Sequence, residues 1–372
     1  MYGRRCSPVR ITAALIVLAA IVLVAGCSDP TAAPPVATDD LSAPWARVDP
    51  SAVGMDEALL AAALDEAGTL PRMRSLLVVR EGFLVSEAYF NGATATNLAD
   101  VRSVTKSVVS LLTGLALSQG HIGSLDETLA DHLPDLVDTL PPAVRGITIR
   151  QLLTMTAGFE WDELGDDDYL DWIAAPDPVA FLLSRPLVDT PGMAFTYNSA
   201  AVHLLGVLLS EAVAMSLSDY ADAVLFGPLR IERREWEVLN DGGLNGGAGL
   251  DLLPEDLARI GQLVLQRGWS GERELVPEAW IGASTAAVRE RRSTYGPLAH
   301  LTYGYLWWVE DDPSHRAVIA WGYGGQFIVV DPSRRMVVVA TSEWRDLDID
   351  GANAQETAVL EIIFGGVLAA GR

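Results

Sequence analysis

The sequence predicts an α+β fold, in which an antiparallel β-sheet is flanked by N- and C-terminal helices and an all-helical subdomain of roughly residues 110–290 is inserted. Three observations predict it: a hairpin pattern near the start, a long middle with helical spacing, and a run of neighbouring strand patterns near the end. Consecutive strands with short connections pair antiparallel. Because both ends of the chain carry strands and the middle does not, we expect the early hairpin to join the later sheet.

Each element follows from its periodicity. Residues 55–67 have apolar side chains at helical spacing, and residues 76–79 and 83–90 are strand-like segments joined by a turn. Helical spacing continues at residues 103–117, 148–154, 179–183, 200–213 and 254–266. Strand patterns then cover residues 303–310, 317–321, 326–331 and 336–341, and a last helix covers residues 352–368. An acidic segment, residues 162–168, lacks the spacing of a calcium loop and is expected to be a solvated loop.

The first 27 residues are typical of a lipoprotein signal peptide. Basic residues precede an apolar run, residues 11–24, that is too short to span a bilayer comfortably. The run ends in Leu-Val-Ala-Gly-Cys27, which resembles a lipobox, whose cysteine is lipidated; an uncleaved or conventionally cleaved signal is the alternative. Residues 28–44 are rich in Pro and Ala and predict a tether to the folded domain, residues 45–372. We therefore expect an exported protein, lipid-anchored to the outer face of the bacterial cytoplasmic membrane.

Composition and missing motifs exclude several function classes. The formal net charge of −23 argues against binding to nucleic acid, whose phosphates need a basic surface. The five histidines are scattered and the cysteines are Cys6 and Cys27, so we expect no metal and no cofactor. Gly-x-Ser-x-Gly, phosphate-loop and His-Glu-x-x-His patterns are absent from the sequence. No obligate protein partner is evident.

Of the 26 Lys and Arg residues, one is a lysine, Lys106, and it lies three residues after Ser103. An arginine stays protonated in proteins, whereas a desolvated lysine can be neutral and act as a base. In a helix that begins near Ser103, the two side chains share one face, and the unpaired N–H groups of the first turn can stabilise an oxyanion. The pair therefore indicates a nucleophile and its base. The alternative is that Ser103 caps the helix and Lys106 is an ordinary surface residue.

Four segments in order resemble the serine β-lactamase and penicillin-binding-protein superfamily. Their motifs are similar to those of its class C-like branch, which contains esterases, and most of all to members related to 6-aminohexanoate-dimer hydrolase. The resemblance covers the chain from about Trp45 onward and implies the β-lactamase/transpeptidase-like fold. The segments are Ser-Val-Thr-Lys at 103–106, Ile-Thr-Ile-Arg-Gln-Leu-Leu-Thr-Met-Thr-Ala-Gly-Phe at 147–159, Pro-Gly-Met-Ala-Phe-Thr-Tyr-Asn-Ser at 191–199, and Trp-Gly-Tyr-Gly-Gly-Gln-Phe at 321–327.

The resemblance implies a role for each matching residue. Ser103 would be the acylated nucleophile, and Lys106 would activate it. Tyr197 would share the proton network and help to protonate the leaving group, and a phenol beside an ammonium has its anionic form favoured; the alternative for Tyr197 is a core tyrosine. The backbone N–H groups of Ser103 and Gln326 would form the oxyanion hole.

Two departures from the β-lactamase pattern bear on substrate choice. Where that pattern has Tyr-x-Asn, this chain has Asn198 one position early and Ser199 third, so either side chain could face the substrate. Where it has Lys-Thr-Gly, this chain has Tyr323 followed by Gly324 and Gly325, which let the backbone approach the substrate closely. A β-lactam carboxylate would lose a charge-assisted contact worth about 1.5–3 kcal/mol.

We therefore expect a serine hydrolase, a carboxylesterase or amidase, that forms an acyl-enzyme with a small-molecule ester or amide. A β-lactamase or D,D-peptidase is the runner-up, and a non-catalytic penicillin-binding-like sensor or binding domain is the alternative from another class. Several tryptophans lie near the motifs in sequence and would form either an aromatic acyl-binding wall or part of the core: Trp161, Trp172, Trp307, Trp308 and Trp321.

Overall fold

The computed structural model describes residues 39–133, 140–165, 168–312 and 315–371. The expected signal peptide, Cys27 and most of the expected tether lie outside the described residues. The folded part begins before Trp45, because Leu41 is 3% exposed and its N–H donates to Ser270 Oγ at 2.8 Å. Within these ranges, no single helix is long and apolar enough to cross a membrane, and one bent pair, Ser199–Val213 with Leu217–Phe226, passes that test by length and composition only.

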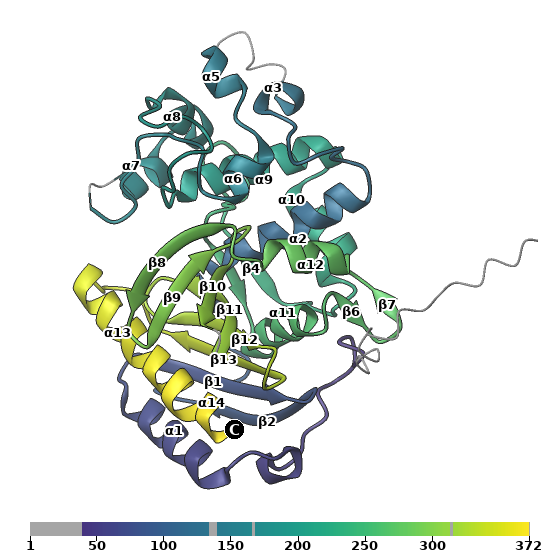
Figure 1. Cartoon of the computed structure of the whole chain (residues 1–372), viewed down its shortest axis with the longest axis vertical. Helices are drawn as coiled ribbons and strands as arrows, with labels where there is room; N and C mark the ends of the chain where they lie inside the picture. Colours follow the sequence, from purple (N-terminus) through teal and green to yellow (C-terminus); the bar gives the residue numbers. More distant parts are fainter. Residues whose placement is uncertain (1–38, 134–139, 166–167, 313–314, 372) are drawn as a thin grey trace, which may run out of the picture. The chain divides into compact units, whose positions relative to one another are not determined.

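An eight-stranded antiparallel sheet forms the centre of the fold (Figure 1). Its order, β2-β1-β13-β12-β11-β10-β9-β8, confirms that the N-terminal hairpin joins the C-terminal strands, because β1 pairs antiparallel with β13. The strands are β1 (Met73–Arg80), β2 (Phe83–Tyr89), β8 (Arg289–Tyr295), β9 (Leu298–Tyr303), β10 (Trp308–Asp312), β11 (His315–Gly322), β12 (Gln326–Asp331) and β13 (Met336–Ser342).

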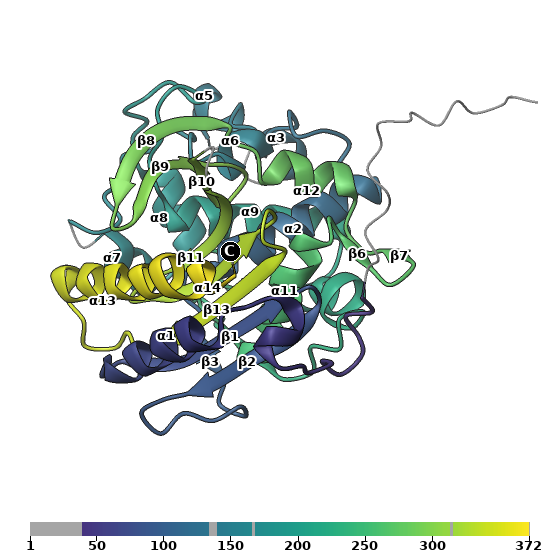
Figure 2. The same ribbon diagram turned by 60° about the horizontal axis from the view of Figure 1, so that its bottom comes forward.

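Helices cover both faces of this sheet. The terminal helices α1 (Glu57–Thr69) and α13 (Ile349–Glu361) lie on one face, with the π-helical turn η3 (Ile362–Val367) and α14 (Leu368–Ala370) (Figures 1 and 2). On β1, Leu76 and Val78 pack into this layer, whereas Leu77 and Val79 pack into the core on the opposite face. Because both faces are buried, the central strands are almost continuously apolar.

The opposite face is covered by α2 (Val104–Ser118) and α11 (Pro254–Leu265). Although α11 lies within residues 110–290, it packs directly on the sheet: a Cβ at Gly261 would lie 2.5 Å from Val337 Cγ1. In contrast, α2 packs on both the sheet and α9 (Ser199–Val213), so it joins the sheet to the helical region.

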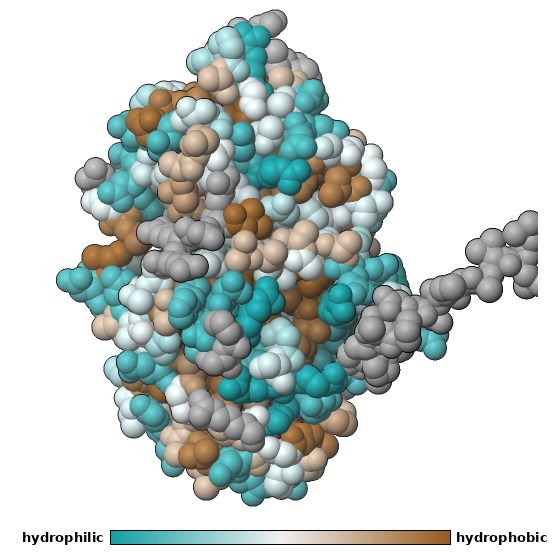
Figure 3. All heavy atoms as spheres, viewed as in Figure 1, coloured by the Kyte–Doolittle hydropathy of each residue, from teal (hydrophilic) through white to brown (hydrophobic). Residues whose placement is uncertain are grey.

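The helical region lies beyond α2 and is built from short helices (Figure 1). They are α3 (Leu129–His132), α5 (Pro142–Arg145), α6 (Ile149–Leu153), α7 (Asp168–Ala174), α8 (Pro178–Ser184), α10 (Leu217–Ala221) and the π-helical η2 (Asp222–Phe226). The helix α12 (Glu278–Ser284) packs against α2. Further short elements are the 3-10 helix η1 (Pro50–Val53), the small sheet β3 (Ala99–Asp100), β5 (Leu250–Leu252) and β4 (Arg234–Trp236), and the pair β6 (Trp269–Ser270) and β7 (Arg273–Glu274). Because β4 to β7 lie within residues 110–290, the expectation that this region is all-helical is wrong. On the face shown in Figure 3, hydrophobic residues lie in separate small patches.

The single strand expected at residues 303–310 is wrong: β9 ends at Tyr303 and β10 begins at Trp308. The chain turns between them because tertiary contacts hold it there. Leu306 has a left-handed backbone with φ of 62°, its N–H donates to Leu153 O, and its carbonyl accepts from Ser107 Oγ at 2.8 Å. A Cβ at Gly304 would lie 2.2 Å from Ser284 O, so only glycine fits this close approach. The edge strand β8 was not expected, since its sequence is mostly charged.

Candidate active site

Ser103 is the N-cap residue of α2, but its side chain makes no capping hydrogen bond. A capping serine needs an extended backbone, whereas Ser103 has φ −68° and ψ −3°, in the right-handed helical region. The preceding turn produces this geometry, because Arg102 has φ of 49° and its N–H donates to Asp100 Oδ1 at 3.0 Å. The capping interpretation is therefore wrong for Ser103, and its hydroxyl is left for another partner.

That partner is Lys106, which is buried with only 1% of its surface exposed. Its Nζ donates to Ser103 Oγ at 2.7 Å, to Ser199 Oγ at 2.8 Å and to the carbonyl of Gly247 at 2.6 Å. The first contact spans three residues of one helical turn, as its spacing predicted. The other two come from distant parts of the chain. Lys106 is thus not the surface residue of the alternative interpretation.

Burial lowers the pKa of the Lys106 ammonium from 10.5 to about 7. Desolvation is the largest cause, the negative charge of Glu163 acts against it, and the positive charge of Arg102 lowers the pKa further. The amine can therefore lose its proton near neutral pH, which is the condition for a general base.

Tyr197 lies beside this pair, in the segment that leads into α9. Its ring stacks on Trp308 with centroids 5.8 Å apart and planes at 21°, and Lys106 Nζ lies 4.8 Å from the ring centroid. Burial raises the pKa of the Tyr197 phenol well above its usual value, and a hydrogen bond with Ser103 acts in the opposite direction. The expectation of a favoured phenolate is therefore wrong, because desolvation by burial is the largest effect on the Tyr197 pKa and raises it. The phenol holds its proton and is able to donate it.

Ser199, and not Asn198, faces Lys106. Asn198 is 3% exposed, and its Oδ1 accepts from the Ala201 N–H at 2.9 Å as the N-cap of α9. Ser199 is the first residue of that helix, and its hydroxyl accepts from Lys106 Nζ. The sequence did not decide which of the two side chains enters the site, because adjacent residues at the start of a helix point in different directions and the direction depends on where the helix begins.

Gly247 supplies the third acceptor for Lys106 and was not expected from the sequence. Asn245 holds it in place: the Asn245 Oδ1 accepts from the N–H groups of Gly247 and Ala248, both at 3.0 Å. The Asn245 amide in turn donates to Glu237 Oε2 at 2.7 Å. A Cβ at Gly247 would lie 2.6 Å from Ser199 O, so a larger residue would push this backbone away from α9. The only local signal was the Asn-Gly-Gly turn.

The turn between β11 and β12 lies directly against the Ser103 turn. A Cβ at Gly322 would lie 2.2 Å from Val101 O, which explains the glycine there. Gln326 is buried and both ends of its side-chain amide bond to Ser342, so its backbone, rather than its side chain, is available to the site.

The remaining residues of this turn are also anchored. Tyr323 OH donates to Leu347 O at 3.0 Å, so its hydroxyl does not replace the missing lysine. The Gly324 N–H donates to Glu356 Oε1 at 2.7 Å, and Gly324 and Gly325 have φ of 75° and 99°, which favour glycine.

The acidic segment is not simply a solvated loop, because Glu163 reaches the site. Its Oε2 accepts from the Ser199 N–H at 2.9 Å and from Trp161 Nε1 at 2.6 Å, and its Oε1 accepts from the Ser199 hydroxyl. No sequence signal separates Glu163 from the other acidic residues of this segment. Only the folded chain brings it to Ser199.

The tryptophans near the motifs divide into two groups. Trp172 and Trp307 are fully buried and Trp161 is 8% exposed, so these three belong to the core. Trp308 and Trp321 are partly exposed, lie 5.6 Å apart between ring centroids, and continue the aromatic surface that begins at Tyr197. Only these two are suited to an acyl-binding wall.

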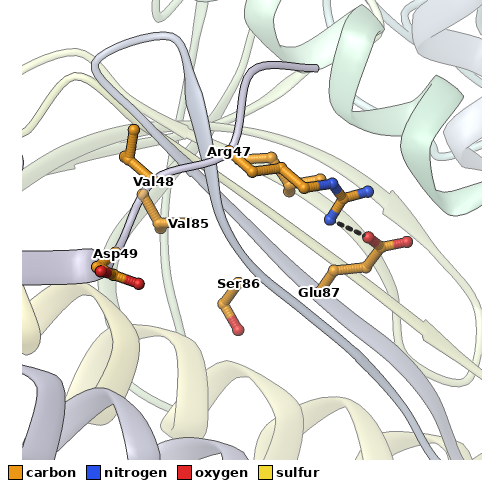
Figure 4. A pocket seen from close by; sticks show the side chains of 7 residues that line it. Arg47, Val48, Asp49, Val85, Ser86 and Glu87 are labelled. Atoms are coloured by element: carbon orange, nitrogen blue, oxygen red, sulfur yellow. Dashed lines mark ion pairs between the residues drawn. The ribbon is translucent and has the colours of Figure 1, made fainter. Parts of the chain in front are cut away.

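Two hollows lie outside this constellation. One, of about 350 Å³, is lined by residues 47–49 and 84–87 and crossed by the Arg47–Glu87 ion pair (Figure 4). The other, of about 240 Å³, is bordered by Asp100 and Trp344. Within the described ranges, the group with metal-ligating potential is His300, Glu310 and Asp312, whose ligand atoms lie within 4.8 Å of one another. It shares no residue with the Ser103 site.

The chain is similar to several known proteins over most of its length. The model of the Beta-lactamase family matches residues 71–360. The 6-aminohexanoate-dimer hydrolase of Paenarthrobacter ureafaciens is 22% identical over 309 residues, which cover 77% of this chain and 76% of that protein. Among solved structures, a putative 6-aminohexanoate-dimer hydrolase from Bacillus anthracis is 19% identical with a TM-score of 0.71, over 90% of this chain and 89% of that one. EstCE1, a hydrolase with promiscuous acyltransferase activity, is 18% identical with a TM-score of 0.63, over 83% and 97%. These structures share the fold.

Proposed function

Because the chain belongs to the Beta-lactamase family, we propose that it hydrolyses esters or small amides through an acyl-enzyme on Ser103. One observation carries the proposal: a buried lysine, whose pKa burial lowers to about 7, lies 2.7 Å from the Ser103 hydroxyl. Nucleophilic catalysis by serine needs an adjacent base of this kind. The proposal agrees with the relatives, whose names describe hydrolases.

Acylation follows from the positions of the groups. Neutral Lys106 takes the hydroxyl proton as Ser103 Oγ bonds to the carbonyl carbon of the substrate. The carbonyl electrons move to its oxygen, which the backbone N–H groups of Ser103 and Gln326 stabilise. When the intermediate collapses, the bond to the leaving group breaks. The leaving oxygen or nitrogen takes a proton from Tyr197, which regains one from the Lys106 ammonium.

Deacylation reverses these roles. A water molecule attacks the acyl carbon and gives its proton to the network of Tyr197 and Lys106. Ser103 Oγ then leaves and recovers its proton, which returns the enzyme to its starting state. The protonated Tyr197 phenol supports this sequence, because a leaving amine or alkoxide needs a donor at that point.

The third motif supports esters and small amides as the substrate class. Because Lys106 is the only lysine in the chain, no ammonium is available to bind the carboxylate of a β-lactam, and Tyr323 directs its hydroxyl to Leu347. The partly exposed Trp308, which stacks on Tyr197, and its neighbour Trp321 offer an apolar surface for the acyl group. We therefore place esters and small amides ahead of β-lactams.

A substrate screen tests this ranking. Purified protein is incubated with p-nitrophenyl esters, linear amides, D-amino-acid amides and nitrocefin, with Ser103→Ala as the control for background hydrolysis. Ester or amide turnover that Ser103→Ala lacks, together with fluorophosphonate labelling of the wild type alone, is the expected result. Nitrocefin hydrolysis at rates comparable to ester hydrolysis would reverse the ranking. Absence of both turnover and labelling would favour a binding domain.

We also propose that the chain is exported and lipid-anchored through Cys27. The support is the sequence alone: a basic start, a short apolar run and Leu-Val-Ala-Gly before the cysteine. In a bacterial host, the wild type should incorporate labelled palmitate and sediment with membranes, and Cys27→Ser should do neither. Labelling of Cys27→Ser at the wild-type level would show that the anchor is elsewhere.

A further inference from the structure

We propose that Glu163 is a positioning residue, which binds the hydroxyl proton of Ser199 and thereby keeps the lone pair of Lys106 available to Ser103. This inference rests on the proposed function, because it assigns a role within the same proton network. It concerns a carboxylate that the acylation chemistry above does not use and that the Ser-x-x-Lys spacing does not include.

The need for such a residue follows from counting protons around Lys106. A neutral amine has two N–H groups and one lone pair, and Lys106 Nζ has three oxygen neighbours, at Ser103, Ser199 and Gly247. The Gly247 carbonyl can only accept, so it takes one N–H. The second N–H and the lone pair are left for two hydroxyl groups, and either hydroxyl is able to accept or to donate.

Only one of the two arrangements is productive. If Ser103 donates to the lone pair, its proton is aligned for transfer and its oxygen becomes nucleophilic. If Ser199 donates instead, the lone pair is occupied by the wrong hydroxyl and Ser103 accepts an N–H. The distances of 2.7 Å to Ser103 and 2.8 Å to Ser199 do not separate the two cases.

Glu163 separates them. Its Oε1 accepts the single hydroxyl proton of Ser199, so Ser199 Oγ is left to accept from Lys106. Hydrogen bonds to an ionised acceptor are roughly twice as strong as those between neutral groups, so this orientation of the Ser199 proton is strongly preferred. The lone pair of Lys106 is then available to Ser103.

The surroundings of Glu163 require a carboxylate. Three donors converge on it: the Ser199 hydroxyl on one oxygen, and the Ser199 N–H and the Trp161 indole N–H on the other. An ionised carboxylate only accepts, so it satisfies all three. A glutamine of the same shape has one acceptor oxygen, and its NH₂ group would face at least one N–H or O–H donor.

The charge of Glu163 provides a separate signal. It raises the pKa of Lys106 against the effect of burial, so its removal should lower that pKa below about 7. The acid limb of the pH–rate profile would then move to lower pH. A residue that merely holds the loop in shape would not move it.

The test compares Glu163→Gln with Glu160→Gln. Glu160 precedes Glu163 by three residues, its side chain is 54% exposed, and its ion pair is with Arg185, so it is a matched control. With p-nitrophenyl butyrate, Glu163→Gln should lower the plateau value of kcat/KM by at least about tenfold, a part of the roughly 10²–10⁴-fold that general acid–base catalysis contributes. Its acid limb should move to lower pH. Glu160→Gln should change neither quantity.

A double-mutant cycle with Ser199→Ala tests the route. Because Glu163 acts on the plateau value of kcat/KM through the Ser199 hydroxyl, adding Glu163→Gln to Ser199→Ala should lower that value little further. The shift of the acid limb to lower pH should persist, because it arises from the charge of Glu163. An equal plateau loss in both backgrounds would overturn the inference. So would an unmoved acid limb, or a Glu163→Gln variant as active as Glu160→Gln.

Ser199→Ala alone keeps the inference testable if Glu163→Gln does not fold, as judged by its melting temperature. This variant removes the competing hydroxyl, so it should retain more than about a tenth of the wild-type plateau rate. A variant that lacks the general base would retain about a hundredth or less. A folded Ser199→Ala variant without ester hydrolysis would mean that Ser199 itself transfers the proton, and would overturn the inference. An inactive wild type, in contrast, would refute the proposed function itself.

Discussion

Hydrolysis by this chain should require a group that loses its proton near pH 7. Burial lowers the pKa of Lys106 from 10.5 to about 7. With the ordinary lysine pKa of 10.5, only about one amine in 3,000 would be neutral at pH 7, whereas the lowered pKa leaves about half of them neutral. The fold thus increases the concentration of active base by about a thousandfold at neutral pH. Below that pH, kcat/KM should fall about tenfold per unit, to roughly one hundredth of its plateau near pH 5.

The assay is the initial rate of p-nitrophenyl butyrate hydrolysis from about pH 5 to about pH 9, followed at a wavelength where the product absorbs independently of pH. Rates from Ser103→Ala are subtracted at each pH, because the ester hydrolyses spontaneously in base. A limb with a midpoint near 7 is expected. A flat profile across this range, or a rate that is still rising steeply at its upper end, would refute the reasoning from burial.

Three further predictions concern Lys106 and the turn beside Ser103. Lys106→Arg should lower kcat/KM by at least about 10²-fold, because an arginine cannot take the Ser103 proton; ester kinetics at pH 8 would show this, and more than a tenth of the wild-type rate would contradict it. Lys106→Met should raise the melting temperature, more at pH 6 than at pH 9. Because burial lowers the pKa of Lys106, the unfolded state binds one more proton than the folded state between about pH 7 and pH 10.5. The burial of Lys106 therefore destabilises the wild type most below pH 7, and this destabilisation shrinks as pH rises. Equal gains in melting temperature at both pH values would count against this prediction. Gly322→Ala should destabilise the fold by about 1–3 kcal/mol and lower kcat, because its Cβ would lie 2.2 Å from Val101 O. At Gly282 a Cβ meets nothing within 4 Å, so the control Gly282→Ala should change neither the stability in denaturant titrations nor kcat in the ester assay.

Much of the fold was predictable because its signals are local. The expected hairpin, the nucleophile helix and the last three expected strands form, and the fold class is confirmed, since strand and helix periodicities depend on neighbouring residues. The break at Leu306 was not predictable, because its turn is held by Leu153 and Ser107, far away in sequence. The strand β8 was missed because an edge strand needs little apolar patterning.

The sequence by itself determined the contact between Ser103 and Lys106. Helical geometry brings residues three apart onto one face whatever surrounds the helix. The chain's single lysine also settled, before any folding, that no second ammonium could serve the third motif.

The tertiary structure decided how that pair can react. Ser199, Gly247 and Glu163 meet at or behind Lys106 across 36 to 141 residues of sequence, and only packing can bring them there. Packing also removes water from Lys106 and so lowers its pKa, because desolvation depends on all the neighbours of a group and not on its place in a motif. A motif can therefore identify a base, but the surrounding fold sets the pH at which it is neutral and which hydroxyl it can deprotonate.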